Sequence, residues 1–169
     1  MGNVVLTLED DVSTDVIYPG RYMATVLPAE TPQFAFADNA PFNAALRGGQ
    51  VPPGSVIVAG KNFGCGSSRE QAVSALKGHA LTIVAESFAR IFLQNAINLG
   101  LHIVAAPGVR ASVGDDLSIG GEDVRNGTTG WSYAVERLPQ ARQAIIDAGG
   151  LIAYTRKRLM DTAAGVTHT

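Results

Sequence analysis

Short apolar runs alternate along the chain with segments whose apolar residues recur at helical spacing. Four of the runs are typical of buried strands, and they span residues 4–9, 55–59, 81–85 and 102–105. Between the last three runs lie two segments with helical spacing, 68–77 and 87–99. Strands that alternate with helices favour a mostly parallel sheet joined by right-handed crossovers. The pattern therefore predicts an α/β fold with helices flanking a central sheet.

The last third of the chain has a different pattern. Short apolar runs at 117–119 and 131–135, with Val124 between them, are separated by Gly-Gly and Asn-Gly pairs, which are hairpin signals. Helical spacing returns over 139–148 and 151–159. We therefore expect a C-terminal β-hairpin region followed by two helices.

Residues 12–54 are the least periodic part of the chain and contain most of its prolines. This composition is typical of loops with short helical pieces. Because a long irregular segment inside a compact domain usually has a function, residues 18–35 are a candidate substrate or partner loop.

Composition narrows the class of protein. The chain has 169 residues, of which 46% are hydrophobic, and this predicts one domain spanning residues 1–169. The formal net charge of -2 argues against nucleic acid, which normally requires a basic surface. No apolar run approaches the roughly twenty residues of a membrane helix, and the N-terminus lacks the basic start of a signal peptide. We expect a soluble protein that binds neither membranes nor nucleic acid.

The chain has a single cysteine, Cys65, so an intrachain disulfide is impossible and a reducing cytoplasm is the favoured compartment. An iron–sulfur cluster takes about four thiolates and a structural zinc site about four ligands, so this chain is expected to hold no metal alone. The basic cluster Arg156, Lys157 and Arg158 has two interpretations. It is either an interaction patch or, as we favour, a set of cations that complements the dipole in the last turn of a helix.

The stretch NFGCGSSRE at 62–70 carries the clearest chemical signal, and its spacing excludes three familiar sites. The third glycine of the dinucleotide-binding fingerprint is missing, and no Gly-Lys-Ser/Thr sequence follows to make a phosphate-binding loop. Glu70 stands where a nucleophile elbow around Ser68 would need glycine. What remains is a glycine turn between a strand and a helix.

Such a turn has two interpretations. Unpaired backbone N–H groups at a helix start attract carboxylate or phosphate, and Arg69 is disfavoured there by the helix dipole unless it faces an anion. The alternative is structural: Ser67 or Ser68 caps the helix, Glu70 or Gln71 closes a capping box, and Arg69 pairs with a surface acid.

Two long motifs resemble a known family. GKNFGCGSSREQA and the following AESFARIFLQNAINLGL closely resemble the small subunits of 3-isopropylmalate dehydratase and homoaconitase, which form the mobile domain of the aconitase superfamily. STDVIYPGRYM at 13–23 is similar to the family's first loop, and AGGLIAYTRKRL at 148–159 is similar to its last helix. The resemblance covers nearly the whole chain and implies an aconitase-type swivelling β/β/α domain.

The resemblance implies roles for particular residues. Ser67 would be the general base, as an alkoxide, with Ser68 assisting and Arg69 clamping a substrate carboxylate. An alkoxide needs concentrated positive potential, which the helix start, Arg69 and preorganised N–H donors offer. The resemblance also assigns five residues to substrate binding, namely Asp15, Arg21, Tyr22, Ala24 and Gly66. For Asp15 the structural alternative is a residue that caps a turn.

The family removes water from a hydroxy acid and returns it through an alkene, with a cluster iron acting on the departing hydroxyl. The resemblance implies that a 4Fe-4S cluster lies on a separate large subunit and that the small subunit is inactive without it. Cys65 is interpreted as a small turn residue rather than a ligand. His79 and His102 fall in apolar stretches and are interpreted as core or surface residues, and His168 as part of a terminal tail.

Position 24 bears on the substrate. Family enzymes for tricarboxylates tend to have arginine there, and an uncharged Ala24 cannot pair with an extra carboxylate. This favours a small hydroxy-dicarboxylate with an alkyl group, such as 3-isopropylmalate. Ala24 is smaller than the valine common in isopropylmalate enzymes, and Gln71 replaces a common histidine, so homoaconitate or dimethylmalate stays open as the substrate. A noncatalytic carboxylate-binding module is the alternative from a different class.

Overall fold

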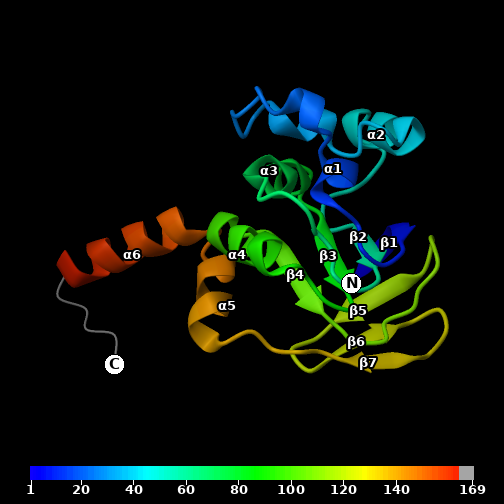
Figure 1. The fold of residues 1–169 in the computed structure, drawn as a ribbon. Helices are drawn as coiled ribbons and strands as arrows, with labels where there is room; N and C mark the ends of the chain where they lie inside the picture. Colours follow the sequence, from blue (N-terminus) through cyan, green and yellow to red (C-terminus); the bar gives the residue numbers. More distant parts are fainter. Residues whose placement is uncertain (164–169) are drawn as a thin grey trace.

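A seven-stranded sheet runs through the molecule in the order β4-β3-β2-β1-β5-β6-β7 (Figure 1). The structure is a computed structural model, and it describes residues 1–163. The strands are β1 (Gly2–Leu8), β2 (Val56–Ala59), β3 (Thr82–Ala85), β4 (His102–Ala105), β5 (Asp116–Ile119), β6 (Asp123–Asn126) and β7 (Ser132–Ala134). Strands β1 to β4 are parallel, and β5 to β7 continue the sheet antiparallel from the other edge of β1. The expected parallel sheet and hairpin region are both confirmed.

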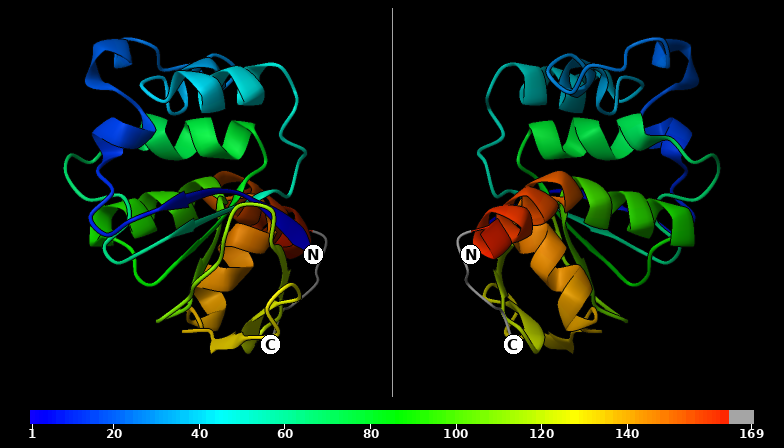
Figure 2. Two further views of the ribbon diagram at one scale, coloured as in Figure 1. Left: turned by 90° about the vertical axis from the view of Figure 1, so that its right-hand side faces the viewer. Right: turned by 90° about the vertical axis from the view of Figure 1, so that its left-hand side faces the viewer.

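The two faces of the parallel strands are buried in different ways. Because side chains alternate along a strand, Ile57 and Ile83 enter the core beneath the helices, whereas Val56 and Val84 enter a second core on the opposite face. Leu117 in β5 belongs to that second core. Figure 2 shows the resulting layers, with the helices of residues 40–47 (cyan) and 70–78 (green) above the parallel strands and β5 to β7 below them. The molecule therefore has the β/β/α arrangement that the sequence resemblance implies.

Two helices connect the parallel strands, α3 (Glu70–Gly78) and α4 (Arg90–Leu99), and both begin later than the sequence predicts. Residues 87–89 do not join α4 because their backbone bonds to the turn before α3. Phe63 N donates to Ser87 O at 3.0 Å, and Ala89 N donates to Phe63 O at 2.9 Å. These non-local bonds hold 87–89 extended and delay the helix.

The proline-rich segment 12–54 forms short helical pieces, as expected. They are α1 (Thr14–Ile17), the 3₁₀ helices η1 (Gly20–Tyr22) and η2 (Thr31–Phe34), and α2 (Ala40–Arg47). Ala35, Phe36 and Phe42 from this segment are buried in the same core as α3. The candidate loop 18–35 is therefore fixed to the body at its C-terminal end.

The chain ends in α5 (Gln140–Asp147) and α6 (Leu151–Ala163), and α6 extends past α4 and α5 (Figure 1). The favoured interpretation of the basic cluster was wrong. Because α6 continues to Ala163, Arg156, Lys157 and Arg158 lie in its middle, and its last turn contains no basic residue. His168 lies outside the described residues.

Candidate functional site

The loop that follows β1 and the loop that follows β2 lie side by side at the carboxyl ends of the parallel strands. Lys61 N donates to Asp10 Oδ1 at 2.7 Å. Thr14 N donates to Cys65 O at 2.8 Å, and Thr14 Oγ1 donates to Ser67 O at 3.0 Å. These bonds bring the STDVI motif against the glycine-serine turn. In open α/β sheets this edge is where ligands usually bind.

Two glycines shape the turn, for different reasons. Gly64 has φ +82°, and a Cβ there would lie 2.2 Å from Phe92 Cγ, so the position allows no side chain. Gly66 has φ +93°, but the nearest atom to a Cβ would be Thr14 Oγ1 at 3.6 Å, so only its backbone conformation requires glycine. Gly64 therefore allows the turn to pack against α4, and Gly66 directs the chain toward Ser67.

Ser67 and Ser68 are exposed at the start of α3 and do not cap it. The N-cap position is Arg69, in an extended conformation, and no side chain caps the helix there. The capping-box alternative is therefore wrong. Backbone N–H groups in the first turn of α3 have no side-chain cap, and both serine hydroxyls lie next to them in the chain.

Arg69 connects the two loops. Its Nη1 donates to Asp15 Oδ1 and, at 3.3 Å, to the carbonyl oxygen of Tyr18. The Arg69 side chain is only 13% exposed, whereas that of Asp15 is 60% exposed. Arg69 Nε is buried and has no hydrogen-bond partner within the described residues. The guanidinium is thus fixed in place while part of its donor capacity is unused.

The pair of Arg69 and Asp15 sets the local charge. The hydrogen bond from Arg69 holds the pKa of the Asp15 carboxyl below its ordinary value, and burial opposes this shift. Asp15 is therefore ionised at neutral pH and orients the guanidinium. The pairing of Arg69 with a surface acid is the part of the structural alternative that is correct. It does not exclude substrate binding, because one carboxylate engages only part of the five-donor fork.

Arg21 and Tyr22 of the first loop both contact residues that follow later in the same proline-rich segment. Arg21 Nη2 lies 2.5 Å from Asp38 Oδ1, and Asp38 raises the pKa of Arg21, while Arg21 lowers the pKa of Asp38. The Tyr22 ring stacks on Phe34 with 4.1 Å between centroids. Both contacts order the loop. For Arg21 to bind a substrate, its ion pair with Asp38 would have to break.

Ala24 lies on an exposed apolar part of the first loop. Met23, Val26 and Leu27 beside it are 45%, 66% and 56% exposed. Gln71 Nε2 in α3 donates to Met23 O at 3.3 Å and so holds this segment beside the start of α3. The structure therefore assigns Gln71 a contact with the loop, which sequence patterns did not indicate.

Of the cysteine and the two histidines considered in the sequence analysis, Cys65 and His79 make structural contacts, whereas His102 is assigned no role. Cys65 Sγ donates to Asp11 O at 3.2 Å, consistent with a turn residue. His79 Nε2 lies 2.8 Å from Pro32 O and so connects α3 to η2. His102 is exposed at the start of the edge strand β4. Sequence reasoning missed Thr14, although it lies inside the STDVI motif, because its hydroxyl contacts only a distant carbonyl.

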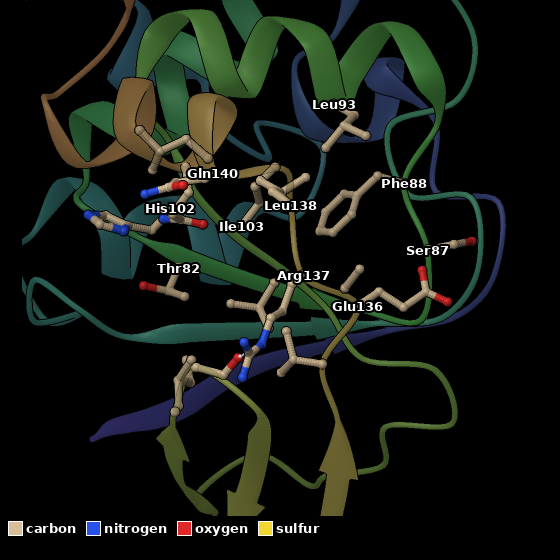
Figure 3. Close-up of a pocket in the computed structure, with 18 residues that line it drawn as sticks. Thr82, Ser87, Phe88, Leu93, His102, Ile103, Glu136, Arg137, Leu138 and Gln140 are labelled. Carbon is tan, nitrogen blue, oxygen red and sulfur yellow. Dashed lines mark hydrogen bonds between the residues drawn. The ribbon is translucent and has the colours of Figure 1, made fainter. Parts of the chain in front are cut away.

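A hollow of about 940 Å³ lies elsewhere, along the outer edge of β4 (Figure 3). Its floor is apolar and includes Ile103 and Leu138. Arg137 on its wall already binds Glu122 and the carbonyl of Gly121. Because Arg137 is engaged in these bonds, the turn at 64–69 is better suited than this hollow to bind a carboxylate.

Residues 1–163 contain no group of three or more His, Cys, Asp or Glu side chains that could hold a metal ion. The side chains present, including the single thiol, therefore do not fit an iron–sulfur cluster. Over the same residues, no helix has both the length and the apolar character needed to cross a bilayer.

Comparison with known proteins gives a consistent result. The aconitase C-terminal domain family matches residues 15–106. An isopropylmalate/citramalate isomerase small subunit of Methanocaldococcus jannaschii is 41% identical over 90% of this chain and 92% of its own. A methanogen homoaconitase small subunit of Methanothermobacter thermautotrophicus is 44% identical over 89% of this chain and 87% of its own. The crystal structure of 3-isopropylmalate dehydratase from M. jannaschii superposes with a TM-score of 0.86 at 38% identity, covering 97% of both chains.

Proposed function

The chain belongs to the aconitase C-terminal domain family, and we propose that it is the small subunit of a hydro-lyase that isomerises an alkyl-malate such as 3-isopropylmalate. The relatives that it matches over most of their length are small subunits of such enzymes, and an enzyme of that name would serve leucine biosynthesis in the cytoplasm.

One observation in the structure carries the proposal. The exposed Ser67 adjoins the uncapped start of α3, two residues from an arginine that is fixed yet keeps unused donors. A carboxylate placed against Arg69 would bring the neighbouring carbon of the substrate toward Ser67. The arrangement supplies both a cation that binds a carboxylate and a base beside it.

The chemistry assigned to this chain is proton transfer. Ser67, as the alkoxide, takes the proton from the carbon next to the substrate carboxylate, and the electron pair of that C–H bond forms the alkene as hydroxide leaves the adjacent carbon. Rehydration on the other carbon isomerises the alcohol, and Ser67 returns the proton. Arg69 holds the carboxylate throughout, and Ser68 and the Gly66 backbone assist at the same turn.

A second polypeptide completes the site in this proposal. Because this chain's donor set does not fit an iron–sulfur cluster, we place a 4Fe-4S cluster on a large subunit, where it would supply the Lewis acid for the departing hydroxyl. The name small subunit in the relatives supports a partner of this kind.

The substrate assignment rests on the first loop. Ala24 offers no charge for a third carboxylate, and the exposed Met23, Val26 and Leu27 beside it suit an alkyl group. One relative is named for isopropylmalate and citramalate, which share a malate core and differ in their alkyl group. A homoaconitase activity, as named in another relative, would have to bind its extra carboxylate without a charge at position 24.

The test is to coexpress the chain with a candidate large subunit and to follow alkene formation from 3-isopropylmalate under anaerobic conditions. Ser67→Ala is expected to lower kcat at least ~100-fold, within the range attributed to a general base, while the complex still forms. Ser118→Ala, which removes an exposed hydroxyl on β5, is the matched control and should leave kcat unchanged.

Turnover that survives Ser67→Ala in an intact complex would refute the catalytic assignment. Calorimetry of the isolated chain addresses the noncatalytic alternative. Binding of isopropylmalate without a partner at millimolar affinity or better would favour a carboxylate-binding module.

A further inference from the structure

Thr14 is buried between the first loop and the glycine-serine turn, and all of its polar groups are engaged. It is 2% exposed. Its backbone N donates to Cys65 O at 2.8 Å, and its Oγ1 donates to Ser67 O at 3.0 Å. Its own carbonyl oxygen accepts from Tyr18 N at 2.8 Å within α1. Because threonine is branched at Cβ, few rotamers are open to it. The hydroxyl is therefore held in one place beneath the turn.

The bond from the Thr14 hydroxyl orients the peptide unit that follows Ser67. The Ser67 carbonyl oxygen accepts a second hydrogen bond from Arg69 N, at 2.8 Å. A trans peptide unit is planar, and its N–H points away from its C=O. Since the carbonyl is held toward the buried Thr14, the N–H of Ser68 points to the opposite side. Both serines are exposed, so this peptide has its donor on the open side of the turn.

Residues 66–68 have few other restraints. Within residues 1–163, the bond from the Thr14 hydroxyl is the only hydrogen bond that joins 66–68 to another segment, because the bond from Arg69 N is local. Gly66 adds no restraint from a side chain, and the nearest atom to a Cβ there would be Thr14 Oγ1 itself, at 3.6 Å. Loss of this hydroxyl would therefore release the backbone that carries Ser67.

We propose that Thr14 is a positioning residue that acts through Ser67. The role rests on the proposed function, in which Ser67 takes a proton from the substrate. The neighbouring Asp15 bonds instead to Arg69, which binds the carboxylate in that proposal. Two consecutive residues of the STDVI motif therefore have separate tasks: Thr14 orients the base, and Asp15 orients the cation. Because Thr14 is buried and leaves Arg69 in place, its loss should lower kcat without raising KM.

Thr14→Val is the direct test in the complex with a large subunit. It keeps the branched shape and the backbone bond to Cys65, and it leaves the Ser67 carbonyl with the bond from Arg69 N. We expect kcat to fall roughly 10- to 100-fold, which corresponds to the loss of one hydrogen bond or a displacement of about 1 Å. KM should stay within about twofold of the wild-type value. Thr14→Ser retains the hydroxyl and should restore most of kcat.

Ser55→Ala is a matched control for the loss of a buried hydroxyl. Ser55 is 4% exposed, and its Oγ donates to Pro52 O at 2.7 Å. That carbonyl also accepts from a backbone N–H, that of Ser55 itself, just as the Ser67 carbonyl does. Ser55 precedes β2, so it lies at the end of the strand opposite the site. Ser55→Ala should lower Tm about as much as Thr14→Val does, and it should leave kcat unchanged.

A double variant shows whether Thr14 acts through Ser67. If it does, Thr14→Val combined with Ser67→Ala should be no slower than Ser67→Ala alone, because the base that Thr14 positions is already absent. A purely structural defect would lower kcat further in the double variant.

The isolated chain gives a readout that needs no partner. Nitrogen-15 relaxation measures the order parameters of the Ser67 and Ser68 amides, which should be near the value of about 0.85 for rigid backbone in the wild type. In Thr14→Val they should fall toward the value of about 0.6 for flexible backbone, whereas Thr14→Ser and Ser55→Ala should leave them unchanged.

Three results would overturn this role while the proposed function stands. They are a Thr14→Val variant that keeps kcat within about twofold although Ser67→Ala abolishes turnover, a Thr14→Ser variant as slow as Thr14→Val, and a double variant slower than Ser67→Ala. Unchanged order parameters in Thr14→Val would also refute it. Turnover that survives Ser67→Ala would overturn the proposed function and this role together.

Discussion

The two glycines of the site turn allow a quantitative test of how the turn is held. Gly64 and Gly66 both have positive φ, but only Gly64 faces a neighbouring side chain at close range. An alanine at either position incurs a left-handed backbone strain of about 1–2 kcal/mol. Gly64→Ala adds an overlap with Phe92, whose Cγ, Cδ2 and Cβ would lie 2.2, 2.4 and 2.5 Å from the new methyl group.

The overlap cannot be relieved cheaply. Phe92 is 2% exposed, and its ring packs edge-on against Phe63, with 5.2 Å between the ring centroids. Overpacking of a well-packed core costs about 1–3 kcal/mol. We therefore expect Gly64→Ala to lower the free energy of unfolding by about 2–5 kcal/mol and Gly66→Ala by about 1–2 kcal/mol. For a chain of this length the difference corresponds to roughly 5 °C in Tm.

Urea unfolding of the isolated chain, followed by far-UV circular dichroism, measures both changes. A double variant, Gly64→Ala with Phe92→Leu, isolates the overlap, because the smaller side chain should recover part of the loss caused by Gly64→Ala. Equal destabilisation by the two alanines, or no recovery in the double variant, would show that contact with Phe92 does not position the turn. Gly66→Ala should still lower kcat in the complex, since Gly66 directs the chain into Ser67.

Three further predictions concern charge. Asp15→Asn keeps the shape but removes the anion that orients Arg69, so kcat/KM should fall roughly 10- to 100-fold; unchanged kinetics would mean that Arg69 needs no orientation. Ala24→Arg should shift the ratio of kcat/KM toward a tricarboxylate at least tenfold, and an unchanged ratio would exclude position 24 from specificity. Bonds from Ser112 N and the Asn126 side chain lower the pKa of Asp115, so its stabilisation is present above about pH 4 and lost as pH falls through the lowered pKa. Thermal melts should show a smaller loss of Tm on acidification in Asp115→Asn than in the wild type.

Local sequence patterns predicted the elements of the fold well. Apolar, β-branched runs mark β2 to β4, and the Gly-Gly and Asn-Gly pairs mark the turns between β5, β6 and β7. The start of α4 was predicted too early because residues 87–89 pair with the turn at 62–63, a non-local contact that propensity does not encode. The start of α3 was predicted too early because Arg69, its N-cap residue, is extended. The dipole interpretation of the basic cluster failed because α6 continues past Arg158.

The site was predictable only in part. The motifs indicated Ser67, Arg69 and Asp15, and the fold brings Arg69 and Asp15 into contact. The carbonyl of Tyr18, the hydroxyl of Thr14 and the amide of Gln71 complete the arrangement through bonds between distant segments. Such partners depend on the register of the two loops, which is fixed only when β1 pairs with β2.

The central position of β1 has a consequence for how the domain opens. It is bonded to β2 along one edge and to β5 along the other, and so joins the parallel strands to the hairpin strands. Beyond β7, Glu136 also forms a single bridge to Ala105 of β4. Opening of β6 and β7 disturbs only the second core and the bridge to Ala105, whereas release of β1 disturbs both cores at once. Amide protons of β1 should therefore exchange with solvent only through global unfolding, which makes this strand the reporter of the domain's full stability.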